Sequence, residues 1–516
     1  MGKFLTILEV SRKQDYIFAS KKLKENALRS EEIRYVTSSD FFMKAASEWY
    51  SKKEKLVYAG GGHTILEFPT QEKAVAFARQ VTRTAMEHYR NMEIFVKTMP
   101  YDEHKTPGEN LKALSAALEK KKALRRASFR RGSFGVEALD SESQLPKLAD
   151  AKGRDKAEPF NPPDGWIYPV QMEELAGADN FVAVVHIDGN AMGKRVDALY
   201  DRYGKAEDWA DCRASLRRFS EGIQQDFEAA FSEMVDTVIR CAPNLEAPNL
   251  PVRPVILAGD DVCFVTAGNI GLECARVFLE KLSAKSNQED GKPYAACAGV
   301  ALVHQKYPFH QAYDLAEELC SNAKRFGAEL DTNGAVSAMD WHIEFGQLKD
   351  SLAELRKDYA TEDGNRLELR PVVVLAPKGI DLSQTGGVRS YAAFRTMCQA
   401  MQGEYEKVAR GKIKDLRTAF HQGKLESEFF LHDQQIWDLL YHGFEAQYRT
   451  KEARMAQYKE LQESGGDLEK NAFVKIGDTE RCLFFDAIEM IDHCCFFQGE
   501  AQLRKCRLTA EEGKKP

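Results

Sequence analysis

PVILAGDDVCFV, at residues 254–265, places two adjacent carboxylates, Asp260 and Asp261, directly after a glycine and between two short runs of β-forming residues. A glycine between two such runs is typical of a tight turn that joins antiparallel strands. We therefore expect a hairpin that carries both acids at its tip, where their oxygens would be available to a divalent cation. Taken alone, the tripeptide Gly259-Asp260-Asp261 is weak evidence for a metal site, because it also occurs in ordinary polar turns.

The hairpin has a counterpart early in the chain, in the segment VYAGGGHTILEF at residues 57–68. A repeat of this kind indicates a duplicated domain. The earlier copy carries glycine where the later copy carries both carboxylates, so we expect the chemistry in the later copy. In this alignment Ala59, Gly60, Gly61 and Gly62 correspond to Ala258, Gly259, Asp260 and Asp261.

The sequence around each hairpin predicts the element order β-α-β-β-α-β. This order is typical of a ferredoxin-like domain, and it occurs twice. The fold class is therefore α+β, with two ferredoxin-like (RRM-like) palm domains and a C-terminal helical domain. The first copy has strands at 3–10, 55–68 and 93–98 with helices at 26–50 and 72–91. The second has strands at 181–188, on either side of Gly259 and at 294–303, with helices up to about 240, near 270–285 and at 309–326.

Changes in composition suggest where the domains end. We expect a first, degenerate palm at residues 1–100, a linker or insert at 101–165, a catalytic palm at 166–335, and a mixed segment with a helical domain at 336–516. The insert carries a basic cluster that could grip phosphates, although a solvated helix face is the commoner meaning of such a run. The cluster consists of Lys120, Lys121, Lys122, Arg125, Arg126, Arg130 and Arg131.

Composition excludes several classes of protein. The chain has 516 residues, 43% of them hydrophobic and 29% charged, which is ordinary for a globular protein. No apolar run approaches the ~18 residues of a membrane span, and the N-terminus lacks a secretory signal, so we expect a cytoplasmic protein without membrane contact. The 11 cysteines include no C-x-x-C pair and are interpreted as reduced core thiols. A net charge of −7 leaves nucleic-acid contact to local patches.

A third carboxylate is expected beside the pair. Asp188 ends the strand FVAVVHID, which the fold places next to the hairpin strand that follows Asp260 and Asp261. Carboxylates that converge from neighbouring strands are what two-metal phosphoryl and nucleotidyl transfer needs, and hard oxygen ligands favour Mg²⁺ or Mn²⁺. We predict that Asp188, Asp260 and Asp261 are both metal ligands and catalytic residues.

The loop after Asp188 reads GNAMGKR and leads into a helix. Glycines at a helix start leave backbone N–H groups free to approach phosphates. The predicted nucleotide contacts are Gly189, Asn190, Gly193, Gly259 and Lys324, the last reaching the β and γ phosphates as a mobile charge. Lys194 and Arg195 are weaker candidates for the same role, and a surface lysine is an equally good interpretation of Lys324.

Together these residues resemble the large polymerase-cyclase subunit of type III CRISPR effector complexes, and more distantly the GGDEF diguanylate cyclases. The likeness covers residues 1 to about 375. It rests on QDYIFASKKLKENALRSEEI, IDGNAMG, AGDD, and the pair MDWHIEFG with LELRPVV. The resemblance implies ATP as substrate, cyclic oligoadenylates as product, and guide or target RNA as a partner through other subunits. Asp188, Asp260 and Asp261 would then be the metal ligands, and residues 189–193 with Lys324 the nucleotide contacts.

Departures from the family pattern narrow this expectation. Many members begin with an HD nuclease domain, whereas this chain begins in the first palm strand, so DNase activity is not expected. The His432-Asp433 dipeptide lacks flanking ligands and is interpreted as a surface or structural pair. The segment FGVEALDSESQLPKLAD has no cysteine where members often carry a four-cysteine zinc module.

The first palm lacks the paired acids, although its triple glycine, Gly60 to Gly62, still allows a nucleotide to approach the backbone closely. It could bind a second ATP or serve only as a packing partner. We expect a nucleotidyltransferase that joins ATP into short, cyclic oligoadenylates in antiviral defence. The alternative is a non-catalytic, nucleotide-binding scaffold of an RNA-guided complex. A free-standing enzyme, which could form a homodimer, is a third option.

Overall fold

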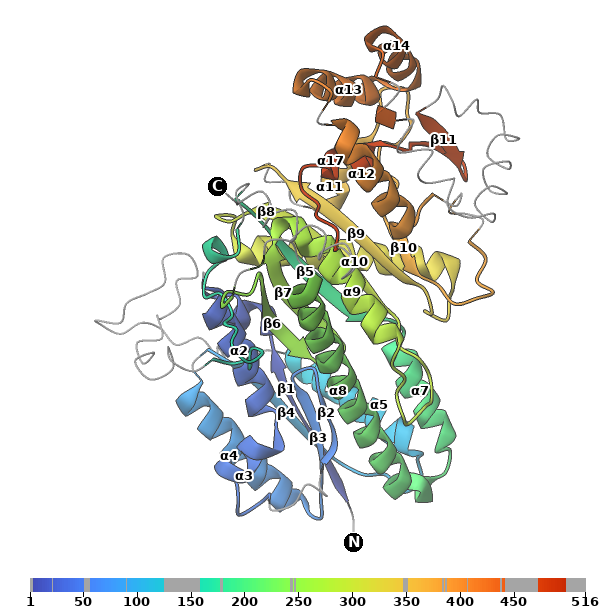
Figure 1. Cartoon of the computed structure of the whole chain (residues 1–516). Helices are drawn as coiled ribbons and strands as arrows, with labels where there is room; N and C mark the ends of the chain where they lie inside the picture. The colour runs from blue at the N-terminus through green and yellow to red at the C-terminus, as the bar shows by residue number, and fades with distance from the viewer. Residues whose placement is uncertain are drawn as a thin grey trace.

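A computed structural model gives the arrangement of the chain (Figure 1). The blue N-terminal part and the green central part each contain a sheet, and the orange C-terminal part lies at the far end of the central one (Figure 1). The structure describes residues 3–20, 22–50, 56–89, 91–124, 158–176, 180–241, 245, 247–346, 351–382, 385, 388–405, 407–436, 439–440 and 472–497.

The first palm is a four-stranded antiparallel sheet in the order β2-β3-β1-β4. Side chains alternate along β1, so Leu5 and Ile7 enter one apolar cluster and Leu8 and Val10 enter another. The sheet is therefore buried on both faces. Its elements are β1 (Phe4–Ser11), α1 (Lys13–Ile17), α2 (Leu23–Val36), α3 (Ser39–Ala45), β2 (Leu56–Gly60), β3 (His63–Phe68), α4 (Gln71–His88) and β4 (Glu93–Pro100).

The second palm repeats this topology in a six-stranded sheet, in the order β10-β9-β8-β5-β7-β6. Its elements are β5 (Phe181–Gly189), α7 (Met192–Arg202), α8 (Trp209–Cys241), β6 (Val252–Ala258), β7 (Asp261–Ala267), α9 (Gly271–Ser283), β8 (Ala296–His304), α10 (Phe309–Leu330), β9 (Ser337–Glu344) and β10 (Val372–Leu375). Short helical turns complete it: η2 (Met172–Glu174), η3 (Ala206–Asp208), η4 (Gly268–Ile270), α11 (Leu352–Leu355) and η5 (Arg356–Tyr359).

The strand order confirms the predicted fold class, because β8-β5-β7-β6 repeats β4-β1-β3-β2. Two features extend the prediction. The second palm was predicted to end at residue 335, but its sheet continues beyond that residue. Strand β9 pairs in parallel with β8, and β10 pairs with β9. The expected single helix before residue 240 is two helices, α7 and α8.

The two palms pack through matching elements. Helix α2 of the first palm contacts β6 of the second, and α8 of the second palm contacts β2 of the first. Each palm thus places its first long helix against the second strand of the other. The apolar stripe of α8 is buried in this packing and against its own sheet, through Leu216, Phe219, Ile223, Phe227, Phe231, Met234 and Val238.

Part of the expected linker is an ordered helix, α5 (Pro107–Ala123), which contacts β4. It begins with a capping box between Thr106 and Glu109, and its buried leucines face the core that both palms share. Lys121 donates to the Val96 carbonyl at 2.7 Å, so the first part of the basic cluster lies on the first palm. Arg125, Arg126, Arg130 and Arg131 lie outside the described residues.

The C-terminal part is mainly helical, as predicted, with a short added hairpin. Its elements are α12 (Tyr391–Tyr405), α13 (Arg410–Gln422), α14 (Lys424–Gln434), β11 (Phe473–Ile476), β12 (Thr479–Cys482) and α17 (Phe485–Met490). His432 and Asp433 are exposed on α14. Within the described part of the chain, no helix is both long and apolar enough to cross a membrane.

Candidate functional site

The three predicted carboxylates meet at one end of the second sheet. Asp188 lies directly opposite Asp261 in the β5–β7 ladder, and Asp260 occupies the turn between β6 and β7. The turn needs a glycine, because Gly259 has a φ of 71°. The backbone N–H of Gly189 donates to the Asp260 carbonyl at 3.1 Å, which ties the end of β5 to the turn. The structure therefore brings these acids together as expected.

Gly189 is required for this approach. A Cβ atom at that position would lie 2.9 Å from the Asp260 Cβ and 2.8 Å from the Met192 Cε. Real Cβ atoms do not come so close to backbone-proximal carbons, so a side chain would push the turn away from β5. Gly189, which the sequence predicted as a phosphate contact, thus allows the turn that carries Asp260 to pack closely against β5.

Basic side chains hold two of the acids. Lys324, on α10, donates to Asp188 and also to the Gly189 carbonyl at 2.9 Å. His186 Nε2 lies 3.1 Å from Asp261 Oδ1. Burial alone would lower the pKa of His186, but its contact with Asp261 raises that pKa above its ordinary value. The sequence did not single out His186, although it precedes Asp188 by two residues and so shares its face of the strand.

The charge at the turn suits a cation. Burial and then the neighbouring Asp188 charge raise the pKa of Asp260 to about 6. Carboxylates crowded in this way bind hard divalent ions such as Mg²⁺ or Mn²⁺ well. Among the described residues no group of three or more His, Cys, Asp or Glu side chains is already arranged around a single metal position. Binding would therefore require Asp188 to exchange Lys324 for the ion.

The glycine turn of the first palm faces this site. A Cβ atom added to Gly259 would lie 3.9 Å from the Gly61 backbone nitrogen. Gly61 and Gly62 have φ values of 55° and 77°, which glycine adopts without strain. The two hairpin turns therefore meet tip to tip between the palms.

The strand pairings of the two hairpins align them differently from their sequences, by one residue. Gly60 pairs with His63 across the first turn, and Ala258 pairs with Asp261 across the second. His63 therefore takes the place of the second acid. The structural equivalences are Gly60 with Ala258, Gly61 with Gly259, Gly62 with Asp260, His63 with Asp261, and Glu9 with Asp188.

A cavity of about 730 Å³ lies between the palms, beside both turns. Its lining includes Gly60, Gly61 and Gly62 from the first palm and Asp261 from the second. Tyr313 from α10 and Gln224 from α8 are among the other second-palm residues of the lining. A volume of this order is typical of small-molecule and cofactor sites.

Two further residues of this cavity escaped the sequence analysis. Lys13 donates to the Gly61 carbonyl, and burial lowers its pKa while the charges of Glu9 and Asp261 oppose that shift. It is a half-buried cation near Asp261, contributed by the other palm. The Gln224 side chain accepts from the Gly259 N–H at 2.6 Å and donates to the Leu257 carbonyl at 3.1 Å, so it fixes the acid turn.

Several predicted nucleotide contacts are occupied elsewhere. Asn190 donates to the Val336 carbonyl at 2.8 Å, and Lys194 donates to the Thr332 carbonyl at 2.7 Å. Arg195 is buried in a two-bond ion pair with Asp290, at 2.7 Å for each bond. Gly193 has open space where a Cβ would be, so it alone of this group faces room for a ligand.

His63 gives the first palm a pH dependence. Burial and then the nearby Lys13 charge lower the pKa of His63 to about 4, against about 6.5 in an unfolded chain. Between these values only the unfolded state binds the proton, so the free energy of unfolding falls as pH falls through this window.

We expect His63→Phe, which keeps the stacking on Tyr58, to remove up to about 2 kcal/mol of the stability difference between pH 7 and pH 5. Urea unfolding of both proteins at the two pH values measures this. An unchanged pH dependence would show that His63 is protonated in the folded state.

Comparisons with known proteins show what the second palm resembles. Residues 181–329 match the family model described as Cas10/Cmr2, second palm domain. That range contains Asp188, Asp260, Asp261 and Lys324. No curated protein matches the chain significantly.

Solved structures with a similar fold include Csm1 from T. onnurineus, with a TM-score of 0.55 and 14% identity over 95% of this chain and 69% of that one. The apo Csm1–Csm4 cassette has a TM-score of 0.50 and 15% identity over 95% of this chain and 70% of that one. A Csm1–Csm4 cassette in complex with cA4 has a TM-score of 0.45 and 16% identity, and the match covers 68% of this chain and 55% of that one. At such identities the likeness is one of fold.

Proposed function

We propose that this chain, whose second palm is of the Cas10/Cmr2 type, joins ATP molecules into short, cyclic oligoadenylates in CRISPR-type antiviral defence. The observation that carries the proposal is the meeting of Asp188, Asp260 and Asp261 at one end of the second sheet, where Asp261 lines the cavity between the palms and the turn at Gly259 faces Gly61. That arrangement can hold two nucleotides with the 3′-hydroxyl of one directed at the α-phosphate of the other.

The donor set fits a divalent ion, which would be held by Asp188, Asp260 and Asp261. When bound, Mg²⁺ or Mn²⁺ lowers the pKa of an attacking hydroxyl and stabilises the charge on transferred phosphate oxygens. The chain's own residues supply the rest. Gly61 and Gly259 let nucleotide phosphates approach the backbone, and Lys324 is within reach of the phosphates once it leaves Asp188.

Lys13 is assigned the role of a phosphate contact across the palm interface. We expect Lys13→Gln to weaken ATP binding about tenfold, because one charged hydrogen bond to phosphate in a partly dry site is lost. Calorimetry with ATP measures the change. Lys73→Gln on the exposed face of α4 is the matched control and should bind ATP as the wild type does. Equal affinities for all three proteins would place the nucleotide away from the first palm.

The alternative function is a non-catalytic scaffold that binds nucleotide without converting it. The ion pair between Lys324 and Asp188 favours this hypothesis, because it neutralises one of the acids. The described residues also contain no preassembled metal position. In either function, guide and target RNA would be contacted through other CRISPR subunits. A third hypothesis is that the chain is a free-standing enzyme that forms a homodimer.

The function is tested by incubating the purified chain with each NTP and Mg²⁺ or Mn²⁺, with and without RNA, followed by mass spectrometry of the products. We expect oligoadenylates from ATP only, and none from the Asp260→Ala, Asp261→Ala double variant. ATP binding without any product would support the scaffold. Product from the double variant would move the chemistry to another site.

A further inference from the structure

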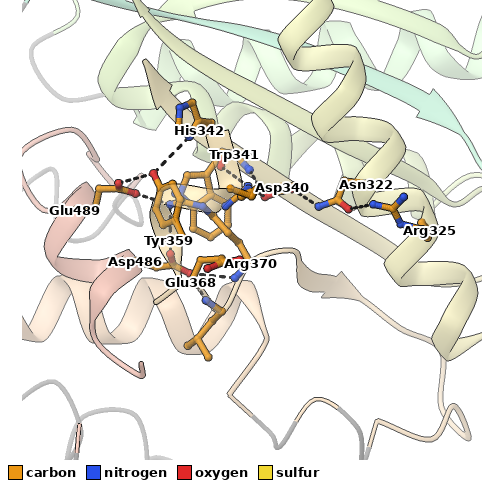
Figure 2. A network of polar contacts seen from close by, with 12 residues as sticks. Asn322, Arg325, Asp340, Trp341, His342, Tyr359, Glu368, Arg370, Asp486 and Glu489 are labelled. Atoms are coloured by element: carbon orange, nitrogen blue, oxygen red, sulfur yellow. Dashed lines mark hydrogen bonds and ion pairs between the residues drawn. The ribbon is translucent and has the colours of Figure 1, made fainter. Parts of the chain in front are cut away.

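A second cavity, of about 260 Å³, lies on the opposite side of α10 from the palm interface, where the second palm meets the C-terminal part. It shares no lining residue with the cavity between the palms. Figure 2 shows the polar network behind it, in which Asn322 on α10 binds Asp340 and Arg370 binds Glu489. Its lining is dominated by guanidinium groups: Arg325, Arg356, Arg366, Arg370, Arg389 and Arg481.

Some of these arginines are neutralised. Arg370, 1% exposed, binds Glu489 at 2.6 Å, and Arg356 binds Asp340 at 2.6 Å. Arg366 pairs with Glu368. These pairs belong to the network that joins β9 to the C-terminal part.

The remaining arginines have no carboxylate partner among the described residues. Arg389 donates to the Leu369 carbonyl at 2.7 Å, and Arg481 donates to the Glu368 carbonyl at 2.7 Å. Burial, and then the charge of the other arginine, lowers the pKa of Arg389 to about 10. Burial likewise lowers the pKa of Arg481. The cavity therefore holds half-buried guanidinium charge, on Arg389 and Arg481, that no ion pair of the described residues neutralises.

Unused hydrogen-bond donors point to the same conclusion. The Nε and Nη2 atoms of Arg370, and the Nε and Nη1 atoms of Arg356, are buried without a hydrogen-bond partner among the residues that the structure describes. A buried donor that is left unsatisfied destabilises the folded protein. Aromatic rings lie against both groups, with Tyr359 4.9 Å from Arg370 and 5.4 Å from Arg356, and offset part of this cost.

The lining also contains acids that limit the excess charge. Glu329 is exposed at the rim, and Glu368 has one buried oxygen without a partner. Asp340, Asp486 and Glu489 stand behind the arginines. The six arginines of the lining exceed these five acids by one charge, and Arg325, Arg389 and Arg481 form no ion pair in the described part of the chain.

We propose that this cavity binds a small oligophosphate anion, either free pyrophosphate or the diphosphate group of a nucleotide. Planar guanidinium groups match phosphate oxygens in pairs, and several of them around one cavity favour an anion with more than a single charge. The volume admits a diphosphate but is about a third of the cavity between the palms. The occupant would join α10, which carries Lys324, to the segments that hold Arg389 and Arg481.

The test is calorimetry on the full chain in metal-free buffer with inorganic pyrophosphate, ADP, and a single-stranded oligouridylate as separate probes. We expect pyrophosphate to bind, and Arg389→Gln with Arg481→Gln to weaken it at least about tenfold. ADP bound with the same arginine dependence would identify a nucleotide as the source, and pyrophosphate alone would identify the free ion. Glu329→Gln should bind severalfold more tightly, a gain that misfolding cannot produce.

Lys73→Gln, on the exposed face of α4, is the control and should leave pyrophosphate affinity unchanged. Lys13→Gln removes a cation from the cavity between the palms, so a tenfold loss of pyrophosphate affinity in this variant but not in the arginine double variant would place pyrophosphate there and overturn the proposal. The proposal is overturned if pyrophosphate does not bind, if the arginine double variant binds as well as the wild type while showing the same circular dichroism, or if only the oligouridylate binds. These outcomes do not depend on whether the chain converts ATP.

Discussion

Asp188→Asn is expected to lower the rate of oligoadenylate formation by on the order of a thousandfold, with ATP and Mn²⁺ saturating. The substitution keeps the shape of the side chain and removes the charge that stands opposite Asp261 in the β5–β7 ladder. A ligand to a catalytic metal contributes several kcal/mol of transition-state stabilisation, and each 1.4 kcal/mol is tenfold in rate. The initial rate of product formation, followed by chromatography, measures the loss.

Asp197→Asn is the matched control for this prediction. Asp197 lies on the same strand-to-helix segment, in α7, and forms an exposed pair with Lys112 at 2.7 Å. Its loss should leave the rate within about twofold of the wild type, because exposed ion pairs contribute little. If Asp188→Asn and Asp197→Asn are equally active, Asp188 does not take part in the reaction.

Arg370→Leu is expected to destabilise the protein by about 3–5 kcal/mol, because it leaves a buried carboxylate without its partner. Arg370 is 1% exposed and Glu489 8% exposed, and their ion pair measures 2.6 Å. The Tyr359 hydroxyl donates to the same carboxylate at 2.8 Å and cannot neutralise it. Figure 2 shows these groups between β9 and the helix α17. Urea unfolding, followed by tryptophan fluorescence, measures the change in free energy.

Two controls make this prediction specific to the buried charge. The double variant Arg370→Leu, Glu489→Leu should regain part of the stability, since Glu489 is no longer left as an unpaired ion. The recovery is incomplete because Asp486, which lies 3.3 Å from the Arg370 guanidinium, also loses its partner. Arg83→Leu removes an exposed helix pair with Glu87 and should change stability by less than about 0.5 kcal/mol. A loss below about 1 kcal/mol for Arg370→Leu would mean that water or another group compensates Glu489.

The fold was predictable from the sequence because its signals are local. Strand alternation, the two glycine turns and the apolar stripe of α8 are patterns within a few residues, and they fixed the order of the elements in both palms. The β9 and β10 strands were missed as parts of the second sheet, because parallel pairing of β9 with β8 joins segments across an intervening helix. The helix α5 was hidden by its charged last turn.

The acids of the site were predictable for the same reason, since strand ends and turns place Asp188, Asp260 and Asp261. Their neighbours were harder to find. Gln224 reaches the acid turn from α8, a helix far from it in the sequence. Lys13 comes near Asp261 only through the packing of one palm on the other, and the contact between Gly61 and Gly259 is likewise a product of that packing. The sequence alignment of the two hairpins differs by one residue from the alignment that their strand pairing gives. The pairing depends on backbone hydrogen bonds, and a run of glycines does not indicate which residues form them.

The arginine cavity could not be predicted from the sequence. Its cations come from α10, the segment around Arg356 and Arg366, and the hairpin that ends near Arg481. Nothing in the spacing of these residues predicts that they face one space. Only the packing of the C-terminal part on the second palm brings them together.

The central claim is that the acids at the palm interface form new bonds between ATP molecules. It is tested most directly by measuring pyrophosphate release from ATP and Mn²⁺ by the wild-type chain and by the Asp260→Ala, Asp261→Ala double variant, with identical circular dichroism as the folding control. We expect release from the wild type, in step with oligoadenylate formation, and none above background from the double variant. Equal release from both proteins, or none from a wild type that binds ATP, would contradict the account.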